Sequence, residues 1–132
     1  MAIDSKKLQQ QADDLSSRIW AIANDLRGGM DANEFRRVIK QCLRFTNETD
    51  AIVTLGMKPN RPETGYGYIQ ADLRVASPRN TEIYRVDQFK EKPDLATAQQ
   101  YIKQNNFFWN AGIFIWSAST IINAFRVYNP AI

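Results

Sequence analysis

The stretch Arg61-Pro-Glu-Thr-Gly-Tyr-Gly-Tyr68 decides how the rest of the chain is interpreted. Pro62 and Gly65, with Pro59 just before the stretch, predict a loop, and Gly67 lies inside the strand expected over Tyr66–Ala71. A glycine within a strand usually marks a bulge or a close approach to the backbone. Two later stretches also combine an aromatic or β-branched strand with charges, amides or glycines, namely Phe89-Lys-Glu-Lys-Pro93 and Trp109-Asn-Ala-Gly-Ile-Phe-Ile-Trp116. Together the three stretches predict one ligand site on a sheet.

The composition limits the kinds of protein that the chain can be. Its 132 residues fit a single domain with a real core, but they are few for separate nucleotide and substrate halves. The net charge of +3 comes from scattered Lys and Arg, so phosphate-bearing ligands fit and DNA binding is not expected. The absence of histidine removes the commonest general base and zinc ligand. Cys42 is the single cysteine, and its apolar helical surroundings predict a buried thiol in a reducing cytosol.

The sequence also gives an expectation about location. No apolar run approaches the roughly 20 residues of a membrane helix. The polar start Met1-Ala-Ile-Asp-Ser-Lys-Lys7 lacks the apolar centre of a signal peptide. We therefore expect a soluble, cytoplasmic protein that does not enter a membrane.

Two amphipathic helices are predicted in the first third of the chain. Apolar residues recur at three- and four-residue spacing from Ser5 to Leu26, and Gly28-Gly29 is expected to end this helix. Asp31 is a suitable cap for the second helix, with Glu34 three residues later. The buried face of this second helix is predicted to contain Phe35, Val38, Ile39, Cys42, Leu43 and Thr46.

The remainder alternates strands with helices. Strands are predicted over Ala51–Met57, Tyr66–Ala71, Glu82–Phe89 and Phe107–Trp116, with a polar connector over Arg74–Thr81. Helices are predicted over Leu95–Gln104, capped by Asp94, and from Ser117 or Ser119 through Phe125. The fold class is therefore α/β, a mixed sheet with flanking helices that is preceded by an N-terminal amphipathic helix.

A first resemblance concerns residues of about 8–38. The segment Ile19-Trp-Ala-Ile-Ala-Asn-Asp-Leu-Arg-Gly-Gly-Met-Asp-Ala-Asn-Glu-Phe35 resembles the N-terminal helical segment of a type I restriction-modification methyltransferase subunit. No Asn-Pro-Pro-aromatic motif or glycine-rich cofactor loop follows it, so methyl transfer is not implied.

A second resemblance rests on spaced motifs that follow one another in unbroken order. They are Phe35-Arg-Arg-Val-Ile-Lys-Gln-Cys-Leu-Arg-Phe45, Ile52-Val-Thr-Leu-Gly-Met-Lys-Pro59, Arg61-Pro-Glu-Thr-Gly-Tyr-Gly-Tyr-Ile69, Tyr84-Arg-Val-Asp-Gln-Phe-Lys-Glu-Lys-Pro93 and Phe108-Trp-Asn-Ala-Gly-Ile-Phe114. Over about residues 34–132 the chain thereby resembles mannose-1-phosphate guanylyltransferase, a sugar-nucleotide nucleotidyltransferase with a Rossmann-like sheet. The resemblance implies the joining of GTP and mannose 1-phosphate into GDP-mannose and diphosphate, assisted by Mg²⁺.

The resemblance also assigns roles to five residues. Glu91 would accept hydrogen bonds from sugar hydroxyls, and Lys92 would hold the sugar phosphate. Asn110 and Gly112 would line the sugar, and the backbone of Gly67 would meet the ring. The chemistry suits these roles, because a carboxylate only accepts hydrogen bonds and Lys is a compact cation.

Other residues keep two interpretations. Glu91 and Lys92 could instead be a solvated charge pair at a strand end, and Arg61 and Glu63 are ambiguous between loop solvation and ligand contact. For the large aromatics, packing on the faces of the sheet is favoured over ligand contact, namely for Tyr66, Tyr68, Trp109 and Trp116.

Parts that the resemblance leads one to expect are not found in the sequence. There is no Gly-Gly-x-Gly-x-Arg-Leu-x-Pro loop for nucleotide phosphates, and we find neither expected Mg²⁺-binding aspartate. Residues 1–30 are therefore interpreted as an N-terminal helical segment and residues 31–132 as an incomplete nucleotidyltransferase-like domain. We expect a fragment that keeps sugar-phosphate or nucleotide-sugar contacts and is inactive alone.

Two alternatives to a guanylyltransferase fragment remain open, and the sequence also gives an expectation about assembly. The chain could be a non-catalytic interaction module, or a recombinant chimera, that uses its N-terminal helix in a restriction-modification setting. A sheet without its first strands would expose an edge, so we expect a homo-oligomer.

Overall fold

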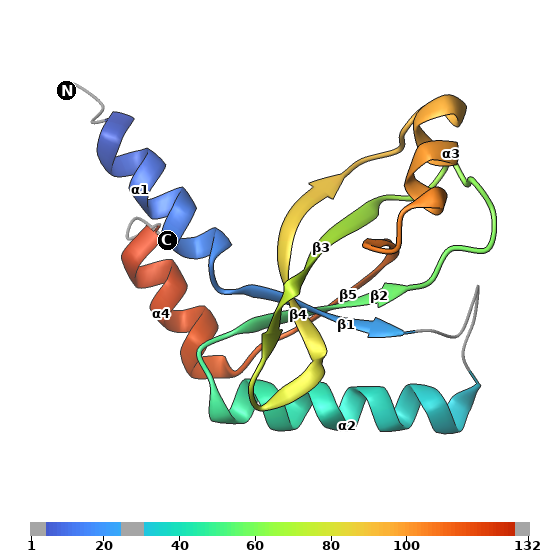
Figure 1. Cartoon of the computed structure of the whole chain (residues 1–132). Helices are drawn as coiled ribbons and strands as arrows, with labels where there is room; N and C mark the ends of the chain where they lie inside the picture. Colours follow the sequence, from blue (N-terminus) through green and yellow to red (C-terminus); the bar gives the residue numbers. More distant parts are fainter. Residues whose placement is uncertain (1–4, 25–30, 129–132) are drawn as a thin grey trace.

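A computed structural model describes residues 5–24 and 31–128 of the chain (Figure 1). Its elements are, in order, α1 (Ser5–Ser16), β1 (Ile19–Asn24), α2 (Ala32–Glu48), β2 (Ile52–Met57), β3 (Tyr68–Ser77), β4 (Asn80–Lys90), α3 (Leu95–Lys103), β5 (Phe107–Ile115) and α4 (Ala118–Tyr128). The α/β class with a mixed sheet and flanking helices is confirmed.

The five described strands close on one another in the order β1-β2-β5-β3-β4. β1 and β2 are parallel over six residue pairs, from Ile19 opposite Ile52 to Asn24 opposite Met57. The other pairings are antiparallel, including that of β1 with β4. Because β1 is paired on both sides, the open sheet edge on which the predicted oligomer rested does not occur among the described strands. The oligomeric state stays a prediction without that support.

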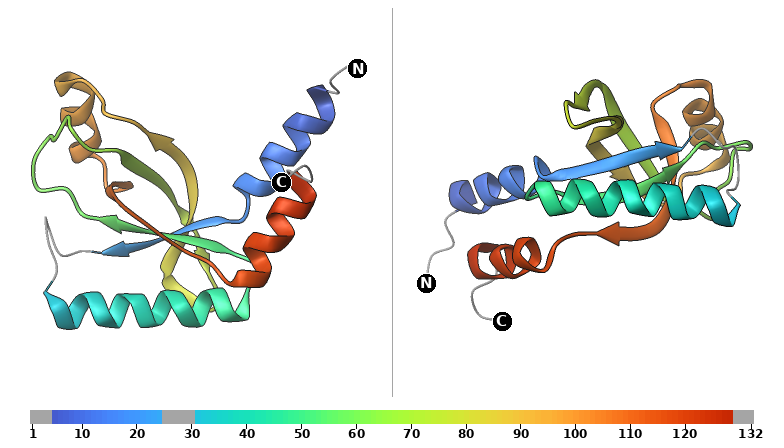
Figure 2. Two further views of the ribbon diagram at one scale, coloured as in Figure 1. Left: turned by 180° about the vertical axis from the view of Figure 1, so that it is seen from behind. Right: turned by 90° about the horizontal axis from the view of Figure 1, so that it is seen from below.

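The largest core cluster lies between α2 and the parallel strands, with α2 running along one side of the sheet (Figures 1 and 2). Asp31 caps α2 as predicted, because its Oδ1 accepts a hydrogen bond from the Glu34 backbone at 2.8 Å. The buried residues of this cluster are Ile22, Val38, Cys42, Phe45, Ala51, Val53, Leu55 and Ile83. Burial raises the pKa of the Cys42 thiol to about 11, so this predicted buried cysteine stays protonated and unreactive.

A second cluster holds α3 against β3 and β5. Tyr68, Ala98, Phe107 and Trp109 are buried in it, and the ring of Tyr101 stacks on that of Phe107 at 4.1 Å between centroids. Asp94 caps α3 as predicted, accepting from the Thr97 backbone at 2.7 Å. This cluster fixes the beginnings of β3 and β5, where two of the three stretches singled out in the sequence meet.

The helix predicted over Ser5–Leu26 is wrong in its second half. α1 ends at Ser16, and Ile19–Asn24 is a strand. A short run in which nearly every residue is apolar fits a buried strand as well as a helix face, and here pairing with β2 and β4 decides. The predicted stop at Gly28-Gly29 lies outside the described residues. The domain division at residue 30 stays a prediction, and β1 belongs to the same sheet as the later strands.

Smaller corrections concern boundaries and burial. β3 and β4 extend through most of the predicted connector and leave a turn at Pro78-Arg79 between them. On α2, Phe35 and Leu43 are exposed, whereas Phe45 is buried, because β1 and β2 cover only one side of the helix. On α4, Ile122 and Phe125 are about half exposed. The start of α4 agrees with prediction, since Ser117 Oγ accepts from the Thr120 backbone at 3.2 Å.

α1 and α4 lie side by side at one end of the molecule (Figure 1). The phenol of Tyr128 donates a hydrogen bond to the Asp14 carboxylate, which joins the end of α4 to α1. None of the helices in the described ranges is both long enough and apolar enough to cross a membrane. The cytoplasmic location stays a prediction.

Candidate functional site

Three of the five predicted site residues meet where β3, β4 and β5 carry their motifs. The backbone N–H of Asn110 on β5 donates to the carbonyl of Gly67, just before β3, at 2.9 Å. A Cβ on Gly67 would lie 3.4 Å and 3.7 Å from the two carboxylate oxygens of Glu91 and 3.7 Å from the Asn110 Cβ. The missing side chain of Gly67 therefore leaves a carboxylate and an amide beside partly exposed backbone, as expected for a position that a ligand approaches closely.

The other two predicted residues extend this arrangement. Gly112 donates its backbone N–H to Asn110 Oδ1 at 2.9 Å, has a φ of +73°, and has no atom within 4 Å of where a Cβ would be. Lys92 follows Glu91 and has a φ of +33°, a left-handed conformation that costs a non-glycine residue about 1–2 kcal/mol. We call Gly67, Glu91, Lys92, Asn110 and Gly112 the Gly67 cluster. Its charged side chains are exposed, so it is an open polar surface.

The loop before Gly67 is held by its own side chains. The Glu63 carboxylate accepts from the Gly65 backbone at 3.1 Å and from Arg61 Nε at 3.1 Å. These hydrogen bonds, that of Gly65 first, hold the pKa of Glu63 below its usual value. The guanidinium of Arg61 lies 4.9 Å from the centre of the Trp109 ring. Arg61 and Glu63 thus have roles within the loop that fix the approach to Gly67.

The aromatic residues divide into two groups. Tyr68 and Trp109 are buried, which confirms the predicted packing on the sheet. Tyr66 and Trp116 are each 43% exposed, and their packing on the sheet stays a prediction. Tyr66 meets Trp109 edge to face at 5.2 Å between centroids, because Tyr66 belongs to the loop and not to β3.

The described residues do not fit a Mg²⁺ site. In the ranges that the structure covers, no three carboxylates or other metal-binding side chains come together. Glu91 is the carboxylate at the Gly67 cluster, and Mg²⁺ in phosphate-transfer sites needs carboxylates together with substrate phosphates. No step that passes through a metal is derived from this chain.

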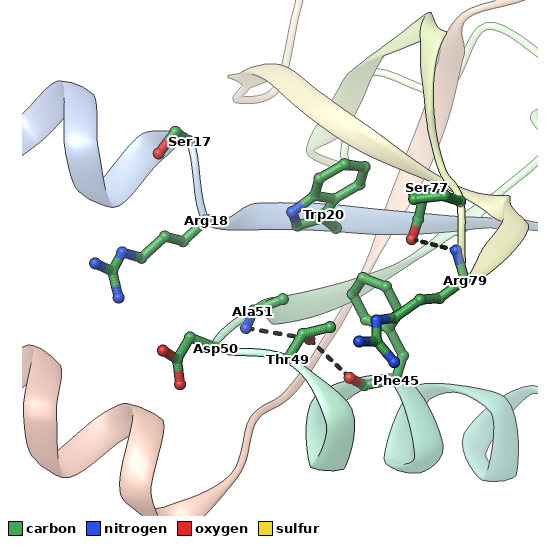
Figure 3. Close-up of a pocket in the computed structure, with 10 residues that line it drawn as sticks. Ser17, Arg18, Trp20, Phe45, Thr49, Asp50, Ala51, Ser77 and Arg79 are labelled. Carbon is green, nitrogen blue, oxygen red and sulfur yellow. Dashed lines mark hydrogen bonds between the residues drawn. The ribbon is translucent and has the colours of Figure 1, made fainter.

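Sequence reasoning missed a second concave site. A cavity of about 370 Å³ lies at the start of β2 (Figure 3). The Gly67 cluster lies toward the other end of this strand, where Gly56 pairs with Asn110. It is lined by Ser17, Arg18, Trp20, Phe45, Thr49, Asp50, Ala51, Ser77, Pro78 and Arg79, and we call it the Trp20 cavity. These residues come from the α1–β1 junction, the end of α2 and the β3–β4 turn, so no local motif signals them.

Comparison with known families identifies the class of protein. Residues 14–129 match the family described as "Nucleotidyl transferase". The chain therefore belongs to the nucleotidyl transferase family. The matched range begins before β1, earlier than the start near residue 34 suggested by the sequence motifs.

Relatives with curated names agree with the motifs. The mannose-1-phosphate guanylyltransferase of Escherichia coli strain K12 is 35% identical over 102 residues, which are 77% of this chain and 21% of that protein. The mannose-1-phosphate guanylyltransferase RfbM of Salmonella typhimurium is 31% identical over 93% of this chain and 24% of its own length. The xanthan biosynthesis protein XanB of Xanthomonas campestris is 45% identical over 64% of this chain. The chain spans about a fifth of the length of these relatives.

Solved structures agree with the fold. A Thermus thermophilus protein titled mannose-1-phosphate geranyltransferase has a TM-score of 0.62 at 36% identity, over 76% of this chain and 28% of that one. The Helicobacter pylori mannose-6-phosphate isomerase has a TM-score of 0.59 at 25% identity, over 76% and 36%. None of these comparisons bears out the resemblance to restriction-modification subunits, which stays a prediction.

Proposed function

We propose that the Gly67 cluster binds the sugar and phosphate of mannose 1-phosphate, or the same part of GDP-mannose. The observation that carries the proposal is the convergence of Glu91 and Asn110 on the side-chain-free face of Gly67. Two relatives are named for the guanylylation of mannose 1-phosphate, which fits a ligand of this class. The net charge of +3 also favours an anionic ligand.

The roles of the individual groups follow from their chemistry. The Glu91 carboxylate accepts hydrogen bonds from sugar hydroxyls, and Lys92 supplies the cation for the phosphate. Asn110 has its Oδ1 engaged by the Gly112 backbone, which orients its amide nitrogen as a donor to a sugar oxygen. Gly112, with open space where its Cβ would be, leaves room for the ring.

The binding test is a titration of the ¹⁵N-labelled chain with mannose 1-phosphate and then GDP-mannose. We expect the amide signals of Gly67, Glu91, Lys92 and Gly112 to move together. Lys92→Met should weaken binding about tenfold, because a hydrogen bond to a charged group is worth roughly 1.5–3 kcal/mol. Lys40→Met removes the same charge from the exposed surface of α2 and should leave binding unchanged. Equal affinity in both variants, or unmoved amides at the cluster, would contradict the proposal.

We further propose that this chain is a fragment in function, and that it does not complete guanylyl transfer by itself. The sequence contains no glycine-rich loop of the Gly-Gly-x-Gly-x-Arg-Leu-x-Pro type, whose amides would cradle nucleotide phosphates. The test incubates the pure chain with GTP, mannose 1-phosphate and Mg²⁺ and follows diphosphate release. Sustained turnover would disprove this second proposal and leave the first one standing.

A second candidate function is a non-catalytic interaction through α1. This helix stands away from the sheet beside α4 (Figure 2). Its Leu8 is 52% exposed. If the chain works in a restriction-modification assembly, it should bind duplex DNA, and its affinity should fall strongly as the salt concentration rises. Salt-dependent binding to duplex DNA that is lost on Leu8→Asp would favour this candidate, and binding of mannose 1-phosphate alone would favour the first.

A further inference from the structure

The Trp20 cavity has the composition of a small-molecule site. Ligand cavities are commonly about 300–1,000 Å³, lined by apolar and aromatic groups with a few convergent polar ones. The cavity of about 370 Å³ has Trp20, Phe45, Ala51 and Pro78 as its apolar walls. The hydroxyl groups of Ser17, Thr49 and Ser77 and three charged side chains supply the polar part.

The aromatic walls select a flat ligand. The rings of Trp20 and Phe45 meet edge to face, with centroids 6.1 Å apart and planes inclined by 64°. Two rings inclined in this way present the face of one ring and the edge of the other to the ring of a bound ligand. Aromatic pairs in such geometry gain about 0.5–1.5 kcal/mol beyond the contribution of their buried area. Core packing also holds the Phe45 side chain in place, because Phe45 is a buried member of the largest core cluster. The walls are thus part of the rigid core.

The rim carries three charged side chains. They are the guanidinium groups of Arg18 and Arg79 and the carboxylate of Asp50. Figure 3 shows the Asp50 carboxylate turned toward α4 and away from Trp20, and Thr120 Oγ1 lies 3.5 Å from it. Its negative charge is therefore directed away from the aromatic walls. Figure 3 shows the Arg18 guanidinium extending away from Trp20 too, so an anion at these walls must draw a guanidinium group from its present carboxylate partner.

The two arginines differ in how firmly they are held. Arg79 contacts Glu48 at 3.2 Å, whereas Arg18 contacts Asp14 at 3.6 Å, with the two side chains 41% and 50% exposed. An exposed pair at that distance contributes about 0–1 kcal/mol, so the Arg18 guanidinium can turn to a better acceptor at small cost. Figure 3 also shows the indole nitrogen of Trp20 on the side of its ring that faces Arg18. An indole N–H and a planar guanidinium together match the two oxygens of a carboxylate.

We propose that the Trp20 cavity binds a small planar aromatic carboxylate, with its ring against Trp20 and Phe45 and its carboxylate between the Trp20 indole N–H and Arg18. This site lies at the start of β2, and the Gly67 cluster lies where Gly56 near the end of β2 pairs with Asn110. The two sites share no residue, so this second site is independent of the binding of a sugar phosphate.

Indole-3-acetate is the probe, and indole-3-acetamide is its neutral control. The chain has three tryptophans, so a ¹⁵N-labelled sample gives three indole N–H signals, which Trp20→Phe and Trp116→Phe assign. We expect indole-3-acetate to move the Trp20 signal to saturation in the millimolar range, and the amide to bind about tenfold more weakly because it lacks the charge-assisted hydrogen bonds. An unmoved Trp20 signal, or equal affinity for acid and amide, would overturn the proposal.

Matched variants test the assigned groups. Arg18→Gln should weaken indole-3-acetate about tenfold and leave the affinity for the amide unchanged. Arg44→Gln removes an equal charge from the exposed surface of α2 and should leave both affinities unchanged. Equal weakening by the two variants would overturn the assignment, because it would indicate attraction to the net charge alone. Thermal unfolding of each variant confirms that the fold is retained.

Discussion

The Gly67 cluster and the Trp20 cavity lie toward opposite ends of β2 and are built in different ways. In the Gly67 cluster, backbone hydrogen bonds from Asn110 to Gly67 and from Gly112 to Asn110 bring polar groups together on an open surface. In the Trp20 cavity, aromatic side chains of β1 and α2 form walls that continue into the core. The first site depends on strand register, and the second depends on how α2 packs on the sheet.

This difference predicts which perturbations each site tolerates. A change in the register or spacing of β5 should damage the Gly67 cluster and spare the cavity, because Asn110 reaches Gly67 only through the pairing of β5. A change at the end of α2 should do the opposite. Loss of the common core should remove both sites together.

The largest effect is expected from Ile83→Ala. Ile83 is fully buried in the core cluster of α2 and pairs with Ile22 across β1 and β4. Truncating its side chain should lower the free energy of unfolding by about 2–5 kcal/mol, which urea denaturation would measure. It should also lower the affinity for the ligand at both sites, which the two titrations would measure. Ile122→Ala on α4, where the side chain is 48% exposed, should cost no more than about 0.5 kcal/mol. Similar losses in the two variants would mean that β4 does not contribute to the core.

A smaller effect, confined to one site, is expected from Gly56→Ala. The new Cβ would lie 2.9 Å from the Phe108 Cβ, so β5 must shift. We expect a loss of about 1–3 kcal/mol in stability and weaker binding of mannose 1-phosphate, with unchanged binding of indole-3-acetate. Gly65→Ala is the control for stability, because its Cβ meets only the end of the flexible Glu63 side chain, at 3.3 Å. Weaker binding of indole-3-acetate with unchanged binding of mannose 1-phosphate would contradict the expected difference between the two sites.

At the other end, Thr49→Val should affect the cavity alone. Thr49 Oγ1 donates to the Phe45 carbonyl at 2.7 Å and accepts from the Ala51 backbone at 3.4 Å. Loss of these hydrogen bonds should cost about 0.5–1.5 kcal/mol and weaken the binding of indole-3-acetate, as calorimetry would show. Thr64→Val, in the exposed loop before Gly67, should not change that binding. An unchanged affinity in Thr49→Val would show that the end of α2 does not shape the cavity.

The smallest effect is a pH dependence at α3. Hydrogen bonds from Thr97 hold the pKa of Asp94 below its usual value in the folded chain. The stabilisation by this carboxylate is therefore complete above its ordinary pKa and is lost as the pH falls through the lowered one. Asp94→Asn keeps a capping side chain that does not titrate. When the pH is lowered by ~3 units through the ordinary Asp pKa of about 3.9, the melting temperature of this variant should therefore fall less than that of the unaltered chain. An equal decrease in melting temperature in the two proteins as the pH falls would contradict the capping role of the Asp94 carboxylate.

Much of the fold could be predicted because its signals are local. The caps at Asp31 and Asp94, the strand over Ile52–Met57 and the aromatic strand beginning at Phe107 all agree with the sequence pattern. Ile19–Asn24 could not be predicted from its own residues, because a run of apolar side chains satisfies both a helix face and a buried strand. The burial of Phe45 in place of Leu43 likewise depends on which side of α2 the sheet covers.

The sequence by itself determined the family motifs, because their glycines, charges and amides recur in a fixed order, and the family resemblance then pointed to the residues of the Gly67 cluster. Only the tertiary structure decided that Gly67, Glu91 and Asn110 are neighbours, since their contact requires the pairing of β5 and the approach of Glu91. Only the tertiary structure shows the Trp20 cavity at all. Its walls come from three segments that are far apart in the chain, and a cavity between elements has no signature in any one of them.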